Sequence, residues 1–360
     1  MLEDLPIQSV VASLGAVLGL IFGYVGRITR FCTLSAVETA LYGDHWVQMR
    51  MWVFAIAVAV LGTLALVELD LIDLSDTVHM LPRVAIAGPI FGGLIFGLGM
   101  AAVGTCGFGS ALRAGSGDLR GLMTVGIIAV VGYTTIRGFL SVPRQSFIEP
   151  LSFTLPPGAT ATVHGLLGLA FDIDPAVLAL PVSVFCALAL AAWCLKDTEF
   201  RENRRAVCGS VIVGLLVVAG WFVTGNIGAD EFEPQPTESL SFVAAASSAL
   251  IYFMTYTGAT ITFGVGMLMG VFVGSYLAAW QKNEVRLEGF DEPREMRRHI
   301  AGAVLMGFGG VLSMGCSIGQ GLTGVSTLAV PSFLALLSMW AGAAIGLHIL
   351  IHGWTFSSRA

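Results

Sequence analysis

The chain has 360 residues, of which 56% are hydrophobic and only 12% are charged, and 45 are glycine. Apolar runs of about 18 residues recur along it, and small residues let membrane helices pack closely or break, so an ordinary soluble domain is excluded. The 18 Lys and Arg and the 24 Asp and Glu give a net charge of −6 without a basic block, so a nucleic-acid partner is not expected. The sequence has no nucleotide-binding motif, and we expect no cofactor.

The hydrophobic pattern predicts about nine spanning helices. Their expected ranges are 7–26, 46–67, 84–103, 120–139, 176–195, 207–224, 252–280, 299–314 and 332–353. The first range follows Glu3 and Asp4 without a Lys or Arg, unlike the basic start of a signal peptide. We therefore expect it to be a mature spanning helix.

Four shorter apolar segments lie between these spans. They are expected at 32–41, 106–113, 239–250 and 316–325. Each is too short to cross about 30 Å of hydrocarbon at about 1.5 Å per residue. Because broken backbone at membrane depth is tolerated only against protein or a water-filled cavity, we interpret these segments as re-entrant half-helices.

A weak internal repeat relates the two ends of the chain. Residue numbers that differ by 210 pair Cys106 with Cys316, Gly97 with Gly307, Gly99 with Gly309, Gly109 with Gly319, Leu112 with Leu322 and Ser116 with Ser326. We expect a first repeat half at 1–145, a linking segment with one spanning helix at 146–205, and a second half at 206–360. The predicted fold is an all-α polytopic membrane protein with two repeats around a central pathway.

The loop charges predict the orientation, because Lys and Arg concentrate on the cytoplasmic side. The basic residues after the fifth and seventh expected spans are Lys196, Arg201, Arg204, Arg205, Lys282, Arg286, Arg294, Arg297 and Arg298. The connection 225–240 instead carries Asp and Glu without any Lys or Arg, so it should face outward. We expect an external N-terminus, a cytoplasmic C-terminus and two halves that are inverted relative to each other, as in many secondary transporters.

Three cysteines stand at the start of a predicted short segment: Cys32, Cys106 and Cys316. In the repeat, Phe242 takes the place that corresponds to Cys32. A helix N-terminus presents unpaired N–H groups and a partial positive charge, which favour an anion and strengthen a thiol as a donor. Several such ends aimed at one point would suit a soft, sulfur-bearing anion.

Neighbouring residues complete the candidate site. The further residues expected along the substrate pathway are Thr33, Gly107, Ser110, Ser317 and Gln320, and Thr323 is another candidate hydrogen-bond donor. Arg30 and Arg113 are either positive-inside anchors or part of an electropositive cytoplasmic vestibule. Glu38 is either an intramembrane coupling carboxylate or a residue at the cytoplasmic interface.

Two other interpretations of the cysteines stay open. They could be packing residues in glycine-rich turns, or a metal relay that uses Met100, Met306 and Met314. His348 and His352 have the spacing of a metal pair, but no third ligand is evident, so we expect no metal site. The remaining cysteines lie in apolar segments and are interpreted as packing residues: Cys186, Cys194 and Cys208.

The stretches RFCTLSA, GTCGFGSALRAGSGD and MGCSIGQGLTG together resemble the YeeE/YedE family of membrane proteins, from about Leu14 to Gly346. The resemblance implies an inverted two-half architecture with short helices that point at the centre. It also implies thiosulfate uptake across the bacterial inner membrane, with Cys32, Cys106 and Cys316 handing the ion along by S–H hydrogen bonds. Gln320 stands where closer thiosulfate-type members have His, which leaves the substrate ion open.

We therefore expect a permease, not an enzyme, for thiosulfate or a related sulfur-containing anion. Its expected partners are the lipid bilayer and, as a candidate, a cytoplasmic sulfur-carrier protein. The alternative is a membrane thiol oxidoreductase or a sulfur or selenium carrier that holds a persulfide on a central cysteine. Moving a dianion into a negative interior costs about 4.6 kcal/mol at about 100 mV, so a proton or rapid consumption of the ion must offset it.

Overall fold

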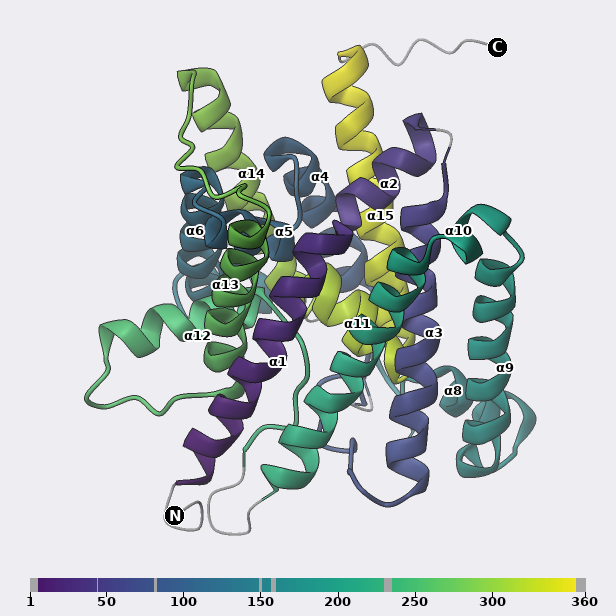
Figure 1. The fold of residues 1–360 in the computed structure, drawn as a ribbon. Helices are drawn as coiled ribbons and strands as arrows, with labels where there is room; N and C mark the ends of the chain where they lie inside the picture. Colours follow the sequence, from purple (N-terminus) through teal and green to yellow (C-terminus); the bar gives the residue numbers. More distant parts are fainter. Residues whose placement is uncertain are drawn as a thin grey trace.

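The computed structural model describes residues 6–43, 45–80, 83–148, 151–156, 160–229 and 235–353. Within these ranges the chain is mainly helical, with one antiparallel pair of short strands, β1 (Arg83–Ala85) and β2 (Ser152–Thr154). Eight helical stretches of the described residues are long and apolar enough to cross a membrane. The protein is an all-α polytopic membrane protein, which confirms the predicted fold class (Figure 1).

The first part of the chain contains two long helices that break into short ones. Its elements are α1 (Ile7–Thr29), α2 (Thr33–Tyr42), α3 (Val47–Glu68), the π-helical turn η1 (Gly88–Gly92), α4 (Gly93–Val103), α5 (Gly107–Gly115) and α6 (Leu119–Ile136). The breaks follow residues in the left-handed region, Arg30 with φ 55° and Gly104 with φ 78°. The short segments expected at 32–41 and 106–113 are therefore present as separate helices, α2 and α5.

A linking region joins the two parts of the chain. Its elements are α7 (Ser141–Pro143), η2 (Arg144–Ile148), β2, α8 (Val163–Phe171), α9 (Pro175–Leu195) and α10 (Thr198–Glu202). The helix α9 matches the span expected at 176–195, and Asp174 caps it by accepting a hydrogen bond from the Ala176 N–H.

The last part repeats the order of the first. Its elements are α11 (Arg204–Phe222), η3 (Val223–Ile227), α12 (Val243–Met254), α13 (Phe263–Gln281), α14 (Pro293–Leu312), η4 (Gly319–Gly324) and α15 (Val330–His352). Here the expectation of one span over 252–280 is wrong, because α12 ends at Met254 and α13 begins at Phe263. The residues between them, TYTGATIT, are rich in β-branched threonine and include a glycine, both of which disfavour helix.

The helix α14 covers most of the span expected at 299–314, but it starts earlier and ends at Leu312. Its first turns carry Arg294, Glu295, Arg297 and Arg298, so it is not among the eight apolar stretches. Those charged turns extend beyond the apolar part of the helix, which accounts for the difference from nine expected spans.

The helices pack in pairs that correspond between the two parts. The helix α1 lies along α13 and α3 lies along α11, while α4 lies along α15 and α6 along α14. Exchanging α1, α3, α4 and α6 with α11, α13, α14 and α15 turns each contact into another of the same set. In Figure 1, α1 begins at the bottom of the view whereas α11 ends there. This arrangement supports the inverted repeat predicted above.

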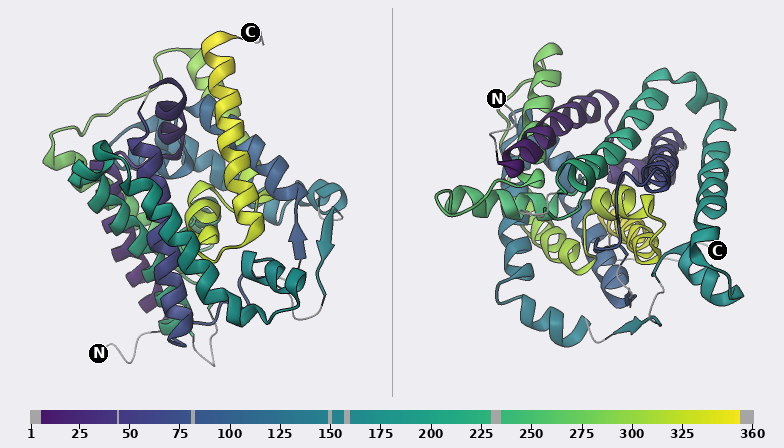
Figure 2. Two further views of the ribbon diagram at one scale, coloured as in Figure 1. Left: turned by 90° about the vertical axis from the view of Figure 1, so that its right-hand side faces the viewer. Right: turned by 90° about the horizontal axis from the view of Figure 1, so that it is seen from below.

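The closest of these contacts depends on glycine. A Cβ at Gly19 of α1 would collide with the Met267 carbonyl of α13, and a Cβ at Gly270 of α13 would collide with the Ala16 carbonyl of α1. The two backbones therefore touch directly, as small residues allow in membrane helices. Figure 2 shows α9 at the periphery of the bundle, where it packs against α3.

Candidate functional site

Each short segment begins at a residue identified from the sequence. Cys32, Cys106 and Phe242 are the N-cap residues of α2, α5 and α12. Cys316 directly precedes the helical turn that leads into η4. The Cys106 Sγ accepts a hydrogen bond from the Gly109 N–H at 3.4 Å, and the Cys316 Sγ accepts one from the Gly319 N–H at the same distance. The two repeat-related thiols thus cap their helices in the same way.

The starts of the short segments converge. The sulfur atoms of Cys32 and Cys106 lie 3.9 Å apart. The Thr33 hydroxyl donates to the Ser317 hydroxyl at 2.9 Å, and the Phe242 N–H donates to the Cys316 Sγ at 3.3 Å. These contacts join α2 to α5, α2 to the Cys316 segment, and that segment to α12.

The convergence lies inside the protein rather than on its surface. Cys106 and Cys316 are 0% and 1% exposed, and Cys32 is half-buried. Because the three thiols come from regions far apart in the sequence, this cluster is a product of the tertiary fold.

Three aromatic rings pack beside the cysteines. The rings of Phe22 and Phe108 stack with centroids 4.1 Å apart, and the Phe108 and Phe242 centroids are 5.0 Å apart. All three side chains are buried. Sequence reasoning singled out only Phe242; the nearness of Phe108 to Cys106 in the chain was the available signal for a second ring.

One cavity, called here the basic cavity, reaches the cluster at Cys32 and has a volume of about 360 Å³. Cys32 and Thr105 line it at the cluster. Its charged lining residues are Arg27, Arg30, Arg113, Lys282, Glu38 and Glu284. It therefore brings together Arg30 and Arg113, which were predicted as positive-inside anchors or vestibule residues, and Glu38, which was predicted as a coupling carboxylate or an interface residue. Glu38 is exposed there, and Arg27 pairs with Glu284 at 3.3 Å.

A second cavity, called here the acidic cavity, has a volume of about 390 Å³. Its lining includes Asp76, His79, Glu238, Ser241 and Gly319, and no Lys or Arg is among its described lining residues. Ser241 precedes the N-cap of α12, and Gly319 donates to Cys316. The acidic cavity thus approaches the cysteines from the Cys316 side, whereas the basic cavity approaches them from the Cys32 side.

The side-chain nitrogen and oxygen of Gln320 each have a hydrogen-bond partner within the protein. Its amide Nε2 donates to the Met314 carbonyl at 2.8 Å, and its Oε1 accepts from the Ser332 hydroxyl at 2.6 Å. Met314 has a left-handed backbone with φ 60°. The side chain therefore holds the turn that carries Cys316.

The two remaining donor candidates differ. Thr323 is buried and donates to the Leu240 carbonyl at 2.8 Å. Ser110, in the first turns of α5, is 0% exposed, and its hydroxyl has no hydrogen-bond partner in the described part of the chain. A buried hydroxyl without a partner is costly, so Ser110 is the stronger candidate to meet a ligand.

The other sulfur and histidine residues lie elsewhere. Cys194 and Cys186 belong to α9 and Cys208 to α11, where Cys208 is exposed. The rings of His348 and His352 stack on α15 with centroids 4.6 Å apart. Among the described residues, no group of three or more His, Cys, Asp and Glu side chains is placed to hold a metal ion.

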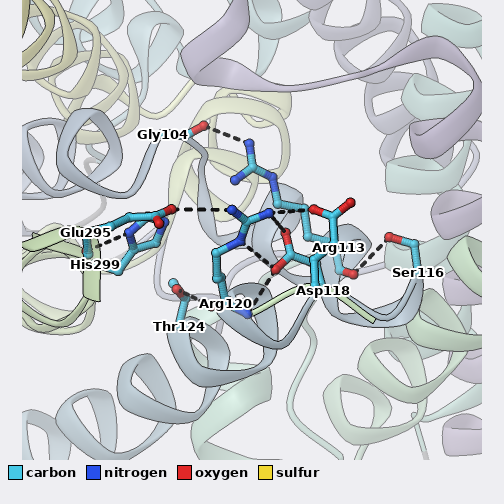
Figure 3. Close-up of polar contacts among 9 residues, drawn as sticks. Gly104, Arg113, Ser116, Asp118, Arg120, Thr124, Glu295 and His299 are labelled. Carbon is cyan, nitrogen blue, oxygen red and sulfur yellow. Dashed lines mark hydrogen bonds and ion pairs between the residues drawn. The ribbon is translucent and has the colours of Figure 1, made fainter. Parts of the chain in front are cut away.

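An ion-pair network that sequence reasoning missed lies beyond the end of α5. The Arg120 guanidinium contacts Asp118 at 2.9 Å, Glu288 at 2.7 Å and Glu295 at 3.3 Å (Figure 3). It ties the start of α6 to the loop 282–292 and to α14. In the same view the Arg113 side chain donates to the Gly104 carbonyl at 3.3 Å and so bridges the break between α4 and α5.

Comparison with known proteins gives matches along nearly the whole chain. The family model described as sulphur transport matches residues 28–345. A protein of Escherichia coli (strain K12) named thiosulfate transporter TsuA is 26% identical over 354 residues, which cover 95% of this chain and 93% of the relative. A protein of the same name from Spirochaeta thermophila is 27% identical over 345 residues, which cover 92% of this chain and 98% of the relative.

Proposed function

This chain belongs to the sulphur transport family, and on that premise we propose that it is a permease for thiosulfate or a closely related sulfur anion. The match confirms the resemblance indicated by the three cysteine motifs, and both relatives above are named for thiosulfate transport. The proposed pathway passes Cys316, Cys106 and Cys32 between the acidic and the basic cavity.

The observation that carries this proposal is the meeting of four short-helix starts at the cysteine cluster. Each start offers backbone N–H groups and the positive end of a helix dipole, which offset the loss of water from a small anion without a fixed cation. The Ser110 hydroxyl is buried without a partner and could donate to the ion. The thiols supply polarizable donors for its terminal sulfur.

We propose that the basic cavity faces the cytoplasm of a bacterium whose inner membrane holds the protein. Lys282 lies on its rim, and Arg27 and Arg30 lie at the end of α1. Basic residues favour the cytoplasmic side. Four basic and two acidic residues line this cavity, so it would attract an anion that has passed Cys32. A cytoplasmic sulfur-carrier protein that accepts the ion there is part of the same hypothesis.

The alternative function is sulfur or selenium carriage or thiol oxidoreduction, and one observation favours it. The Cys32 and Cys106 sulfurs are close enough for an S–H contact. If one thiolate attacks the terminal sulfur of thiosulfate, the S–S bond of the ion breaks, sulfite leaves, and the persulfide formed lies beside the other thiol. This alternative predicts a cysteine whose mass rises by one sulfur atom after incubation with the substrate. The permease requires no covalent step, and all three thiols should stay unmodified.

We expect purified protein in sealed liposomes to take up sulfur-labelled thiosulfate, and Cys106→Ser and Cys316→Ser each to lower the initial rate at least about tenfold. A hydroxyl is smaller and less polarizable than a thiol and would open a gap in the buried cluster. Initial rates from rapid filtration check this expectation. Cys208→Ser is the matched control, because that exposed thiol lies on α11, away from the short helices.

Wild-type uptake no faster than leakage into protein-free liposomes would reject the permease. Uptake at the wild-type rate in both variants would instead keep the permease and reject the thiol pathway. Mass spectrometry of the same samples distinguishes the permease from the sulfur-carrier alternative, since it reports whether a sulfur atom has been added to a cysteine.

A further inference from the structure

The acidic cavity presents a problem for an anion pathway, because the charge of its half-buried Glu238 has the wrong sign. Glu238 faces the cavity, and no Lys or Arg accompanies it among the described lining residues. An ionised carboxylate there would repel a dianion through a low-dielectric space, where Coulomb interactions are strong. We propose that Glu238 is a proton-binding site whose protonation admits the substrate anion to the acidic cavity. This inference rests on the proposed permease function and deepens it.

The position of Glu238 is set by its backbone. The Thr224 hydroxyl of η3 accepts from the Glu238 N–H at 3.1 Å and donates to the Glu238 carbonyl at 2.5 Å. The carboxylate lies near Gly264, in the first turn of α13, and the Gly264 N–H lowers its pKa. The N-cap residue of that helix, Thr262, makes no side-chain capping bond, so Glu238 is the acidic side chain beside the start of α13.

Few other charged side chains lie near the Glu238 carboxylate. The first turns of α12 and α13 carry no acidic residue. From the segment before β1, His79 and Asp76 line the same cavity, and Asp76 is exposed. His79 packs edge-on against Trp221, and burial lowers the pKa of its imidazole to about 4, so it is neutral near pH 7.

The charge of Glu238 therefore dominates the buried part of the cavity, and it changes near neutral pH. Burial raises the pKa of the Glu238 carboxyl to about 7, against the smaller lowering effect of the nearby Gly264 N–H. Below that pH the group is neutral, and the helix N-termini and the exposed Asp76 are the remaining electrostatic influences. Above it, the anion and the carboxylate compete for the same space.

Proton binding and anion binding are then linked, and each strengthens the other by the same factor. If the anion binds only when Glu238 is protonated, the external KM for thiosulfate rises up to about tenfold for each pH unit above the pKa. A Gln at this position is neutral at every pH and keeps an oxygen for the Gly264 N–H. Glu238→Gln should therefore show a KM that varies less than about twofold between pH 6 and 8.5.

The test measures initial thiosulfate uptake by full-length protein in liposomes at zero membrane potential, with internal pH constant and external pH varied from 6 to 8.5. We expect the wild-type KM to rise steeply above pH 7, and Glu238→Gln to remove that rise while keeping uptake at pH 6. Glu68→Gln is the matched control, because Glu68 is an exposed acid at the end of α3. It should keep the wild-type pH profile.

A second measurement does not depend on transport. Infrared difference spectra between pH 6 and pH 8 should contain a protonated-carboxyl band that is absent from Glu238→Gln. If the wild type transports thiosulfate but shares its pH profile with Glu238→Gln, or if this band persists in the variant, the inference is overturned and the permease stands. If the wild type does not transport thiosulfate, both proposals fall.

Discussion

At the Cys316 turn, one side chain supports a strained backbone. Met314 has a positive φ and Gly315 follows with φ 159°, and the Gln320 amide ties this turn to Ser332 of α15. Sequence reasoning placed Gln320 among the substrate donors because it follows Cys316 closely. Only the fold shows that its amide is bonded to Met314 and Ser332, which makes it a positioning residue for the thiol.

We expect Gln320→Ala to lower uptake and to expose Cys316 to alkylation. Its loss removes the side-chain partner of the Met314 carbonyl and the shorter contact of the buried Ser332 hydroxyl, which keeps only His79 Nδ1 at 3.5 Å. A buried polar group left unsatisfied costs about 1–3 kcal/mol. The rate of maleimide labelling at Cys316, read by peptide mass spectrometry, should rise several-fold. Gln48→Ala is the control, since the Gln48 Oε1 has no partner among the described residues. Labelling unchanged from wild type would contradict the positioning role.

At the scale of elements, the loop 282–292 is fastened at both of its ends. Arg27 of α1 pairs with Glu284, and Arg120 of α6 pairs with Glu288. Backbone bonds reinforce the second attachment, because the Leu119 N–H donates to the Glu288 carbonyl at 2.9 Å. The loop forms part of the rim of the basic cavity through Lys282 and Glu284, so these attachments shape the exit proposed for the anion.

Arg120→Ala should release this loop. The change leaves three carboxylates, those of Asp118, Glu288 and Glu295, close together without their shared cation. We expect hydrogen–deuterium exchange across 282–292 to become at least about tenfold faster, which corresponds to about 1.4 kcal/mol of lost local protection. Arg137→Ala, an exposed arginine at the other end of α6, should leave this exchange unchanged. Equal exchange in both variants would show that backbone bonds alone hold the loop.

At the scale of the molecule, the paired helix contacts support two halves with opposite directions. The pairs α1–α13 and α11–α3 correspond under exchange of the halves, as do α4–α15 and α14–α6. A site between inverted halves lies near the middle of the bilayer in many transporters. We propose the same placement here, since two cavities approach one cysteine cluster from different sides.

The proposed orientation predicts opposite labelling of two exposed positions. The two variants are Ser75→Cys and Arg201→Cys. Position 75 lies between α3 and β1, and position 201 lies in α10, between α9 and α11. In intact cells, a membrane-impermeant maleimide should label a cysteine at position 75 and not one at 201, while inside-out vesicles should give the reverse. The same labelling pattern in cells and in inside-out vesicles would contradict the assigned orientation.

The prediction from sequence worked best where a local property decided the structure. The helix breaks before Cys32 and Cys106 were predicted because an apolar run ends in glycine or polar residues within a few positions. The boundary near Met254 was wrong, because a Thr-rich stretch remains apolar enough to resemble a continued span. Asp230, Glu231 and Glu233, which helped to predict the outer face, lie outside the described residues.

The sequence alone therefore determined the membrane class, the sulphur transport family, and three thiols at the starts of short segments. Run lengths, glycine positions and motif spacing are written in consecutive residues, so they can be interpreted without coordinates. The tertiary structure decided which of these starts touch, since the partners Thr33 and Ser317 are 284 residues apart in the chain. It likewise decided that Glu238 lines a cavity near the first turn of α13, because an amphipathic pattern specifies which residues are buried and not which neighbour they meet.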